Sequence, residues 1–310
     1  MTIGNHLDKF AGYKVEDWQA GQPLKNLENT IYRIAVDYDD KQTWDEKFQQ
    51  YLAEPNAKET RGLVLGAYSE EMFEVSCDDP INAVIAAKDQ LPLLDTLFVN
   101  DITYEENEIS WIVNTDNAPL IHAFPKLKHF GTRGGNDLGF TNLNAPELET
   151  LIVQSGGLAS ETIKEIANAN LPKLKHLEIY LGTEDYGYGG SVEDLQPILQ
   201  DRFNQLTYLG LVNCDEQDNI AKAVANAPVV THLETLDLSL GTLGDEGAQA
   251  LLDSKNLDNL KHLDLNHNYL SETMVEKLEA FAAAKGFTID VSSDADYDED
   301  DDWRYVSIGE

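Results

Sequence analysis

Two aspartates stand at the same position of a repeated phrase, at a spacing that could support chemistry. Asp237 lies in LETLDL, which begins at Leu233, and Asp264 lies in LKHLDL, which begins at Leu260. Neighbouring strands of a sheet are about 4.8 Å apart, so adjacent strands of this kind would bring the two carboxylates together. Such a pair could share a proton or hold a cation. The alternative is a solvated acidic surface, because the chain contains 56 acidic side chains.

The histidines favour a structural role over metal binding. Three of the seven, His129, His176 and His262, share one position of the repeated phrase. Their strands are not adjacent, so the side chains should lie about 10 Å apart or more. One tetrahedral ion, with bonds of roughly 2 Å, cannot use two of them. The sequence also lacks an HExxH motif and a nucleophile elbow. We therefore predict neither a metal nor a cofactor.

Two insertions between the repeated phrases contain aromatic residues. Residues 183–190, TEDYGYGG, combine glycine with Tyr186 and Tyr188, a composition typical of adaptable contact loops. This loop lacks the pattern of a phosphate-binding loop, so it is predicted to contact a partner or to serve as a spacer. Residues 104–111, YEENEISW, form a second insertion, and Trp111 and Ile112 are expected to pack beneath it as core.

The phrase L-x-x-L-x-L, or a close variant, supplies the elements that position these residues. It begins at residues 94, 127, 148, 174, 206, 233 and 260. A short strand that cannot bury its own apolar face, repeated every 21 to 33 residues, is typical of a leucine-rich-repeat solenoid. Helical segments between the phrases indicate a sheet on one side and helices on the other. The predicted fold is an α/β leucine-rich-repeat solenoid, a right-handed horseshoe with a concave parallel sheet and outer helices.

The same patterns predict the bounds of the elements. Besides the seven phrases, strands are expected at residues 30–36, 61–65 and 287–291. Expected helices cover residues 44–52, 83–91, 160–170, 191–199, 219–227, 245–252 and 271–285. Residues 1–60 are assigned to an N-terminal cap, 61–293 to one continuous solenoid and 294–310 to an acidic tail with a C-terminal segment. Residues 294–302 favour disorder, whereas the apolar residues 303–308 are expected to fold back onto the body.

Alternation along each strand turns the leucines into the core and the residues between them onto the concave face. A rigid array of such side chains binds a partner without a large cost in ordering entropy. Aromatic residues would supply contact area and charged residues would steer the partner. The predicted partner-binding residues are Arg133, Glu178, Tyr180, Tyr186, Tyr188, Tyr208, Asp237 and Asp264.

Two resemblances support the repeat assignment. Residues 233–265 resemble ribonuclease-inhibitor-type repeats, in which a turn of the form L-G-D-E-G, here residues 243–247, opens the helix. The whole chain is similar to a bacterial family of leucine-rich-repeat proteins with no assigned activity. The shared phrases lie between residues 6 and 306 and include EISWI from Glu108, LGTEDYG from Leu181 and RYV from Arg304. The resemblance implies a fold and no mechanism.

One position of the repeat departs from the short-repeat pattern. The turn residue that is often Asn or Cys is Asn268 and Cys214 in two coils, but it is glycine at positions 135, 156, 182 and 241. An incomplete row of side-chain hydrogen bonds to the turns is therefore expected.

Charge and cysteine usage limit the partners and the location. The net charge of −34 disfavours nucleic acid and anionic membranes as partners, so a neutral or basic protein fits better. The two cysteines have no ligand-like spacing, and the N-terminal residues lack the pattern of a signal peptide. These observations predict a cytoplasmic protein without a membrane span.

The sequence therefore predicts a non-catalytic protein–protein interaction module that binds a partner on its concave face and rim loops. Two alternatives remain open. One is an enzyme, or a small-ligand or cation binder, that uses Asp237, Asp264 and Glu178. The other is an acidic inhibitor of a basic enzyme.

Overall fold

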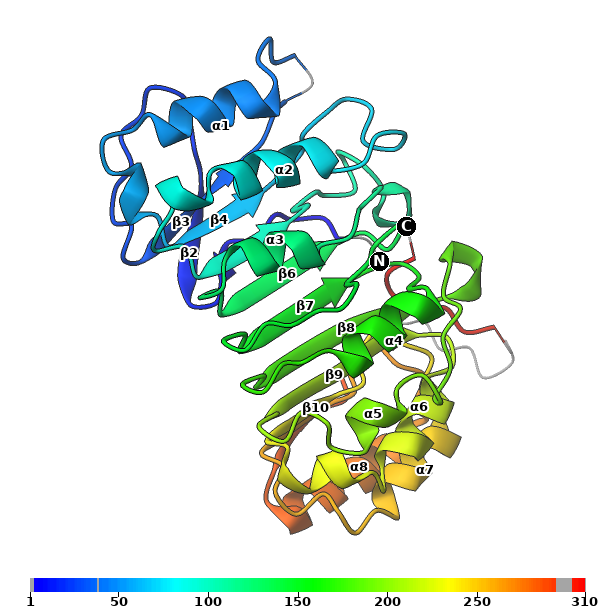
Figure 1. Ribbon diagram of the computed structural model, residues 1–310. Helices are drawn as coiled ribbons and strands as arrows, with labels where there is room; N and C mark the ends of the chain where they lie inside the picture. The colour runs from blue at the N-terminus through cyan, green and yellow to red at the C-terminus, as the bar shows by residue number, and fades with distance from the viewer. Residues whose placement is uncertain (1–2, 38, 294–302, 310) are drawn as a thin grey trace. The chain divides into compact units, whose positions relative to one another are not determined.

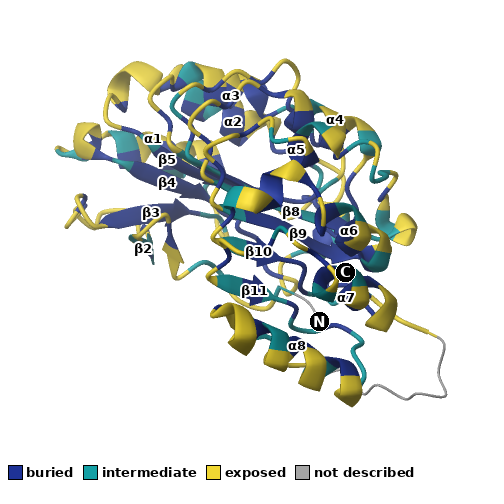
Figure 2. Cartoon of the chain, turned by 90° about the horizontal axis from the view of Figure 1, so that it is seen from below, coloured by how far each residue is buried: buried dark blue, intermediate teal, exposed yellow. Residues whose placement is uncertain are grey.

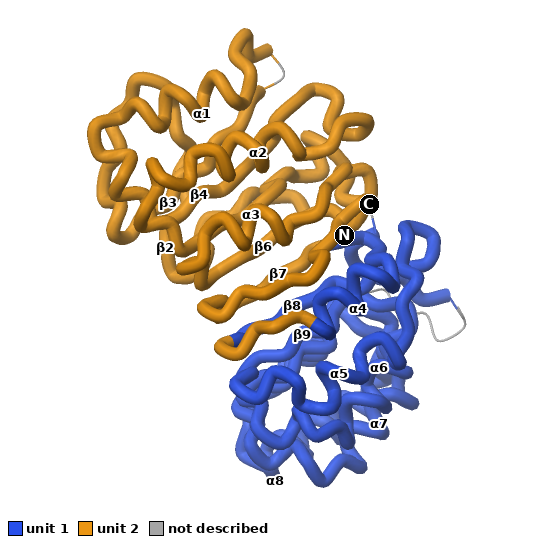
Figure 3. The backbone as a smooth tube through the Cα atoms, in the orientation of Figure 1, with its two compact units in different colours: residues 1, 155–168, 174–309 blue, residues 2–154, 169–173, 310 orange. Residues whose placement is uncertain are grey.

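The computed structural model describes residues 3–37, 39–293 and 303–309. They form an α/β fold of short strands and helices that divides into two compact units (Figures 1 and 3). Among the described residues, unit 2 contains residues 3–154 and 169–173, and unit 1 contains residues 155–168 and 174–309. The expected acidic tail, residues 294–302, lies outside the described residues.

The sheet of unit 2 keeps its strands in chain order. β1 and β2 pair antiparallel, and each later neighbouring pair in this unit is parallel. The helices α1, α2 and α3 cover one face of the sheet (Figure 1). The strands are β1 (Lys9–Phe10), β2 (Tyr13–Asp17), β3 (Thr30–Ile34), β4 (Gly62–Leu65), β5 (Thr96–Val99), β6 (His129–Arg133) and β7 (Thr150–Gln154). The helices are α1 (Trp44–Leu52), α2 (Asp78–Ala86) and α3 (Ala118–Ala123).

Local sequence explains where α1 begins and which face it buries. Glu46 N donates to Thr43 Oγ1 at 3.2 Å, and Thr43 N donates to Glu46 Oε2 at 3.1 Å, which completes a capping box. Trp44, Phe48 and Tyr51 are buried against the sheet, and Trp44 Nε1 donates to the carbonyl of Ile34 at 2.8 Å.

The strands of unit 1 are parallel and also follow chain order. Figure 2 shows the largely buried strand β9 and the exposed outer faces of α6 to α8. The strands are β8 (His176–Gly182), β9 (Tyr208–Cys214), β10 (Thr235–Asp237), β11 (His262–Asp264) and β12 (Thr288–Asp290). The helices are α4 (Ser160–Asn168), α5 (Gln196–Leu199), α6 (Gln217–Val224), α7 (Asp245–Leu252) and α8 (Glu272–Lys285).

The repeated phrases form the expected strands in the expected register. In unit 1 the first outward position forms one row of paired residues: His176, Tyr208, Thr235 and His262. The leucines that follow them in sequence also pair, and all four are fully buried: Leu177, Leu209, Leu236 and Leu263. The leucine period therefore places its apolar residues in the core of this unit.

Asn268 performs the backbone-binding role expected of an asparagine at the turn position. Its Nδ2 donates to the carbonyls of Leu238 at 2.9 Å and Leu265 at 3.0 Å, and its Oδ1 accepts from Leu243 N at 2.9 Å. Because Leu238 and Leu243 lie between β10 and α7, Asn268 joins the segment that follows β11 to the segment that follows β10. The side chain is 3% exposed, so these bonds satisfy a buried amide.

The N-terminal segment covers the outward face of the unit 2 sheet, which the sequence pattern did not predict. Phe10 packs edge-on against Phe98, with ring centroids 5.3 Å apart, and both side chains join a buried cluster with Val15 and Val64. Gly131 makes room for this arrangement, because an added Cβ would lie 2.4 Å from Cδ2 of Phe98. The outward positions at Phe98 and Val64 are therefore core rather than a contact surface.

None of the helices formed by the described residues has both the length and the apolar character that a membrane span requires.

Candidate partner-binding surface

The outward face of β8 to β11 in unit 1 keeps side chains that are accessible to solvent. Glu178, Tyr180, Tyr208 and Asp264 are partly exposed, whereas Asp237 is 8% exposed. The alternating burial along β8 shows that one face of this strand meets the core and the other meets solvent. Four of the predicted contact residues therefore share one accessible sheet face.

Tyr208 is held rigidly at the centre of this face. Its ring stacks on His176 with a centroid distance of 3.9 Å and an interplanar angle of 11°. Its hydroxyl donates to Asp237 Oδ2 at 2.6 Å. Gly210, the partner of Asp237 in the neighbouring strand, leaves room for the ring, because an added Cβ would lie 3.2 Å from Tyr208 Cε1. A contact here would cost little side-chain entropy, because the ring is already fixed.

The hydroxyl of Tyr208 stays protonated over the physiological range. Burial raises the pKa of Tyr208 far above its ordinary value, and the charges of Glu178 and Asp237 raise it further. Burial also raises the pKa of Asp237, although hydrogen bonds from Ser239 and Tyr208 oppose this rise. Tyr208 therefore acts as a hydrogen-bond donor to the carboxylate.

Asp237 and Asp264 are adjacent, as predicted, but each carboxylate also closes the turn that follows its own strand. Asp237 Oδ1 accepts from Ser239 N at 3.0 Å, and Asp264 Oδ1 accepts from Asn266 N at 3.0 Å. Asp290 repeats this bond at the end of β12. A carboxylate that accepts the backbone N–H two residues later stabilises a turn, so these acids have a structural role. Among the described residues, no group of three or more His, Cys, Asp or Glu could hold a metal ion.

The rim loop after β8 is more tightly packed than an adaptable contact loop. Tyr188 is buried at 6% exposure, and Tyr186 is partly exposed. The loop lies directly over Gly157, where an added Cβ would be 2.3 Å from the carbonyl oxygen of Tyr186. Gly187 permits the turn through its φ of +102°. Tyr188 therefore anchors the loop, and Tyr186 is the partly exposed tyrosine of the two.

Arg133 lies in unit 2 and does not lie on an accessible face. Its side chain is 1% exposed, and its guanidinium pairs with Asp101 at 3.4 Å. Nε donates to Gln154 Oε1 at 3.0 Å, and Nη1 donates to the carbonyl of Ile102. The expected placement on an accessible face is wrong for a physical reason: the charge is buried and is paired there with Asp101, because a buried charge needs an ionic partner.

Asp101 is the centre of this buried ionic cluster. Arg33 Nη1 donates to its Oδ2 at 2.8 Å, and the backbone N–H of Leu7 donates to the same oxygen at 3.2 Å. Burial acts to raise the pKa of Asp101, but His6, Arg133 and Arg33 together hold the pKa below its ordinary value. The hydrogen bond to Asp101 raises the pKa of His6. The cluster ties the N-terminal segment to the sheet.

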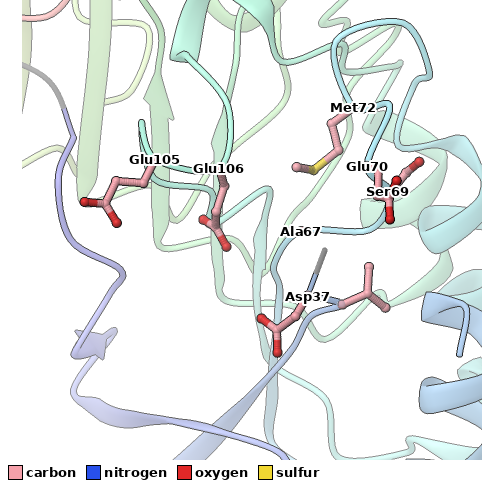
Figure 4. A pocket seen from close by; sticks show the side chains of 8 residues that line it. Asp37, Ala67, Ser69, Glu70, Met72, Glu105 and Glu106 are labelled. Carbon is pink, nitrogen blue, oxygen red and sulfur yellow. The ribbon is translucent and has the colours of Figure 1, made fainter. Parts of the chain in front are cut away.

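Unit 2 also contains an acid-lined cavity that the repeat pattern did not indicate (Figure 4). It has a volume of about 210 Å³, and Asp37, Glu70, Glu105 and Glu106 line it together with Met72. None of the described residues that line it is basic, so the cavity favours a cationic group. Exposed apolar side chains occur on the same loops: Phe73 is 48% exposed and Tyr104 is 47% exposed.

Trp111, in the neighbouring insertion, lies on the surface. It is 55% exposed, whereas Ile112 is fully buried, so only the second of the two side chains expected beneath this insertion is core.

Comparison with known proteins shows similarity to a solved structure. The chain matches no protein-family model and no curated protein sequence. It is similar to the crystal structure of a Bacteroides fragilis protein that was a structural-genomics target. The two share 32% sequence identity with a TM-score of 0.78, over 86% of this chain and 75% of that one. The likeness therefore extends over most of both chains.

Proposed function

The chain belongs to the family of this Bacteroides fragilis protein, and we propose that it is a non-catalytic protein-binding module. The rigid aromatic and acidic face of unit 1 carries the proposal. Tyr208 is stacked on His176 and bonded to Asp237, and Tyr180 and Glu178 lie on the adjacent strand. Fixed aromatic side chains bordered by charge are typical of the energetically dominant residues of interfaces.

The hydrogen bonds that Asp237 and Asp264 already accept favour a binding role over acid–base catalysis. The carboxylates of Asp237 and Asp264 each accept a hydrogen bond from their own turn, and Asp237 accepts a second from Tyr208. A general base must reach the proton of a bound substrate, and both oxygens of Asp237 and Oδ1 of Asp264 already accept hydrogen bonds from neighbouring donors. The partly exposed Glu178 and Asp264 instead supply negative charge at the edge of an aromatic contact.

A neutral or basic protein is the partner that suits this surface. The net charge of −34 accelerates encounter with a cationic surface and repels anionic ones. Inhibition of a basic enzyme is one form that such binding could take, and it rests on the charge alone.

We infer further that the fold is a leucine-rich-repeat solenoid with ribonuclease-inhibitor-like repeats and that the protein works in the cytoplasm. The buried leucine rows and the bonds of Asn268 between two coils support the first inference. Two unpaired cysteines support the second, because reducing compartments preserve thiols. Burial raises the pKa of both Cys77 and Cys214 to about 12, so both stay protonated and unreactive.

Affinity capture from the native cells tests the proposed function. The bait proteins are the intact chain, a Tyr180→Ala/Glu178→Gln variant and a Glu279→Gln control on the exposed side of α8. We expect at least one protein that the intact chain and the control retain and that the double variant loses. Retention of every specific protein by the double variant would contradict a binding role for this face.

A further inference from the structure

The C-terminal segment, residues 303–309, lies along the turns of unit 1 and is held through its main chain. Asn213 Oδ1 accepts from Ile308 N at 2.8 Å, and Asn213 Nδ2 donates to Ile308 O at 2.6 Å. The carbonyl of Leu240 accepts from Ser307 N at 2.8 Å. Asn213 is fully buried, so its amide is committed to this segment rather than to solvent.

The rest of the segment makes the same kind of contact. Tyr305 N donates to Tyr269 Oη at 3.0 Å, and that hydroxyl lies 3.1 Å from the carbonyl oxygen of Tyr305, to which it donates. Arg304 Nη1 donates to the carbonyl of Thr242 at 3.2 Å and lies 3.6 Å from Asp218 Oδ2. Most of these hydrogen bonds are made to main-chain atoms of the segment, which any extended peptide would offer. The ion pair between Arg304 and Asp218 adds a preference for a cationic residue at that position.

Two glycines make room for the segment. An added Cβ at Gly156 would lie 2.3 Å from the carbonyl oxygen of Gly309, and one at Gly244 would lie 2.2 Å from Arg304 Nη1. The clash at Gly156 would involve the backbone of the segment, whereas the clash at Gly244 would involve only the flexible side chain of Arg304. A side chain at position 156 would therefore disturb the bound segment more than one at position 244. We call the surface formed by Gly156, Asn213, Leu240, Thr242 and Asp218 the tail-binding strip.

The segment is held by few apolar contacts. Ile308 is its one buried large apolar residue among those described, at 7% exposure. Trp303 and Tyr305 are 70% and 67% exposed, the highest values among the large apolar side chains of the described residues. A segment that buries so little apolar surface separates from its site at lower cost than a core strand does.

We propose that the tail-binding strip is a peptide-binding site and that the chain's own C-terminal segment fills it as a tethered, displaceable ligand. The ligand it fits is an extended segment of a partner protein with a cationic residue four positions before an aliphatic residue, followed by glycine. Asp218 would pair with the cationic residue, and Asn213 would hydrogen-bond to the main chain of the aliphatic residue. Gly156 leaves room for the backbone of the ligand's glycine to lie close to the strip. Partner binding would release Trp303 and Tyr305. The tail-binding strip and the sheet face of the proposed function consist of different residues. The experiments on one site therefore do not decide the proposal for the other.

A fluorescent synthetic peptide of residues 303–310 tests the proposal on the full chain. In Ile308→Asp the tethered segment carries a charge into the buried position and leaves the strip. A tethered ligand competes at an effective concentration of about 1 mM, so we expect this variant to bind the peptide at least ~10-fold more tightly than the intact chain. Equal peptide affinity of the intact chain and the Ile308→Asp variant would overturn the proposal.

Matched glycine variants locate the peptide. In the Ile308→Asp background, Gly156→Ala should weaken peptide binding at least ~10-fold, because the new Cβ meets the peptide backbone. Gly189→Ala is the control, because its added Cβ would make only an ordinary contact, 3.8 Å from Ser160 N. Equal weakening by both variants, or by neither, would overturn the assignment of the site.

Hydrogen exchange of the intact chain tests the displaceable state without a variant. The amides of Ser307 and Ile308 should exchange at least ~100-fold faster than those of β9, because the segment opens locally. Exchange at the same rate as β9 would show that the segment leaves only when unit 1 unfolds and would overturn the proposal.

The oligomeric state tests which chain supplies the ligand. Concentration-dependent dimers of the intact chain that Ile308→Asp abolishes would overturn the assignment to a partner protein, because the tail of a second copy would then be the occupant.

Discussion

Tyr208 shows how one residue connects burial, charge and recognition on the sheet face of unit 1. Its hydroxyl satisfies the nearly buried carboxylate of Asp237, and its ring stacks on His176. The adjacency of Asp237 and Asp264 followed from the repeat, but the role of these acids did not. The sequence did contain a signal for that role, because Asp-x-Ser or Asp-x-Asn recurs at 237, 264 and 290 and favours a side-chain-closed turn.

Removing the hydroxyl of Tyr208 tests this arrangement. Tyr208→Phe should lower the free energy of unfolding at pH 7 by about 1–3 kcal/mol, because a buried carboxylate loses a donor. The pKa of Asp237, already raised by burial, should rise further. The deficit should therefore shrink as the pH falls through that pKa, since the protonated carboxyl no longer needs the donor. Urea unfolding and carboxyl carbon NMR measure both quantities. Tyr305→Phe is the exposed control, and an unchanged pKa of Asp237 would contradict the account.

His6 gives a pH signature to the buried ionic cluster of unit 2. Its pKa is raised in the folded state by the hydrogen bond to Asp101, so protonated His6 stabilises the fold below its ordinary pKa of about 6.5. This stabilisation is lost as the pH rises through the raised folded-state pKa. His6→Ala should therefore lower the melting temperature more at pH 6 than at pH 9. Equal decreases at the two pH values would refute the predicted coupling.

The elements that the sequence predicted well are those with a clear apolar period. The helix at residues 44–52 has the predicted bounds, and so does α7 at residues 245–252. The helix expected at 191–199 is shorter, because Pro197 is accepted only in a first turn and the helix begins at Gln196. β1, β2 and α3 were missed, because elements of two, five and six residues outside the leucine phrases carry too little period to detect.

The N-terminal hairpin should be important for the stability of unit 2. Phe10 is 6% exposed and packs on Phe98, so Phe10→Ala should cost about 3 kcal/mol through lost burial and a residual cavity. Phe73→Ala, at a side chain that is 48% exposed, is the matched control and should change stability by less than about 0.5 kcal/mol. Denaturant unfolding followed by tryptophan fluorescence gives both values. Similar losses for the two variants would argue against a covering role for the hairpin.

At the scale of the whole molecule, the charge of −34 is distributed over a chain with only 22 basic side chains. The leucine period predicted the α/β class and the parallel strands. It could not predict a partner, because recognition depends on which outward side chains stay accessible after the termini have packed. Unit 1 keeps its outward sheet face partly exposed, while the N-terminal segment covers Phe98 and Val64 in unit 2.

Salt should weaken partner binding, because long-range attraction between an acidic surface and a cationic one is screened. We expect the Kd for the captured partner to increase about tenfold between 0.1 and 0.5 M NaCl, over which the Debye length falls from about 10 Å toward 3 Å. The loss should lie mainly in the association rate. Surface plasmon resonance at several salt concentrations measures both constants. A Kd independent of salt would contradict a basic partner.

Hydroxyl-radical footprinting of the complex with the captured partner tests the central claim most directly. If the sheet face of unit 1 binds the partner, oxidation of His176, Tyr180 and Tyr208 should decrease several-fold in the complex, and Phe73 of unit 2 should be unaffected. Unchanged oxidation of these three residues, with protection elsewhere on the chain, would contradict the account.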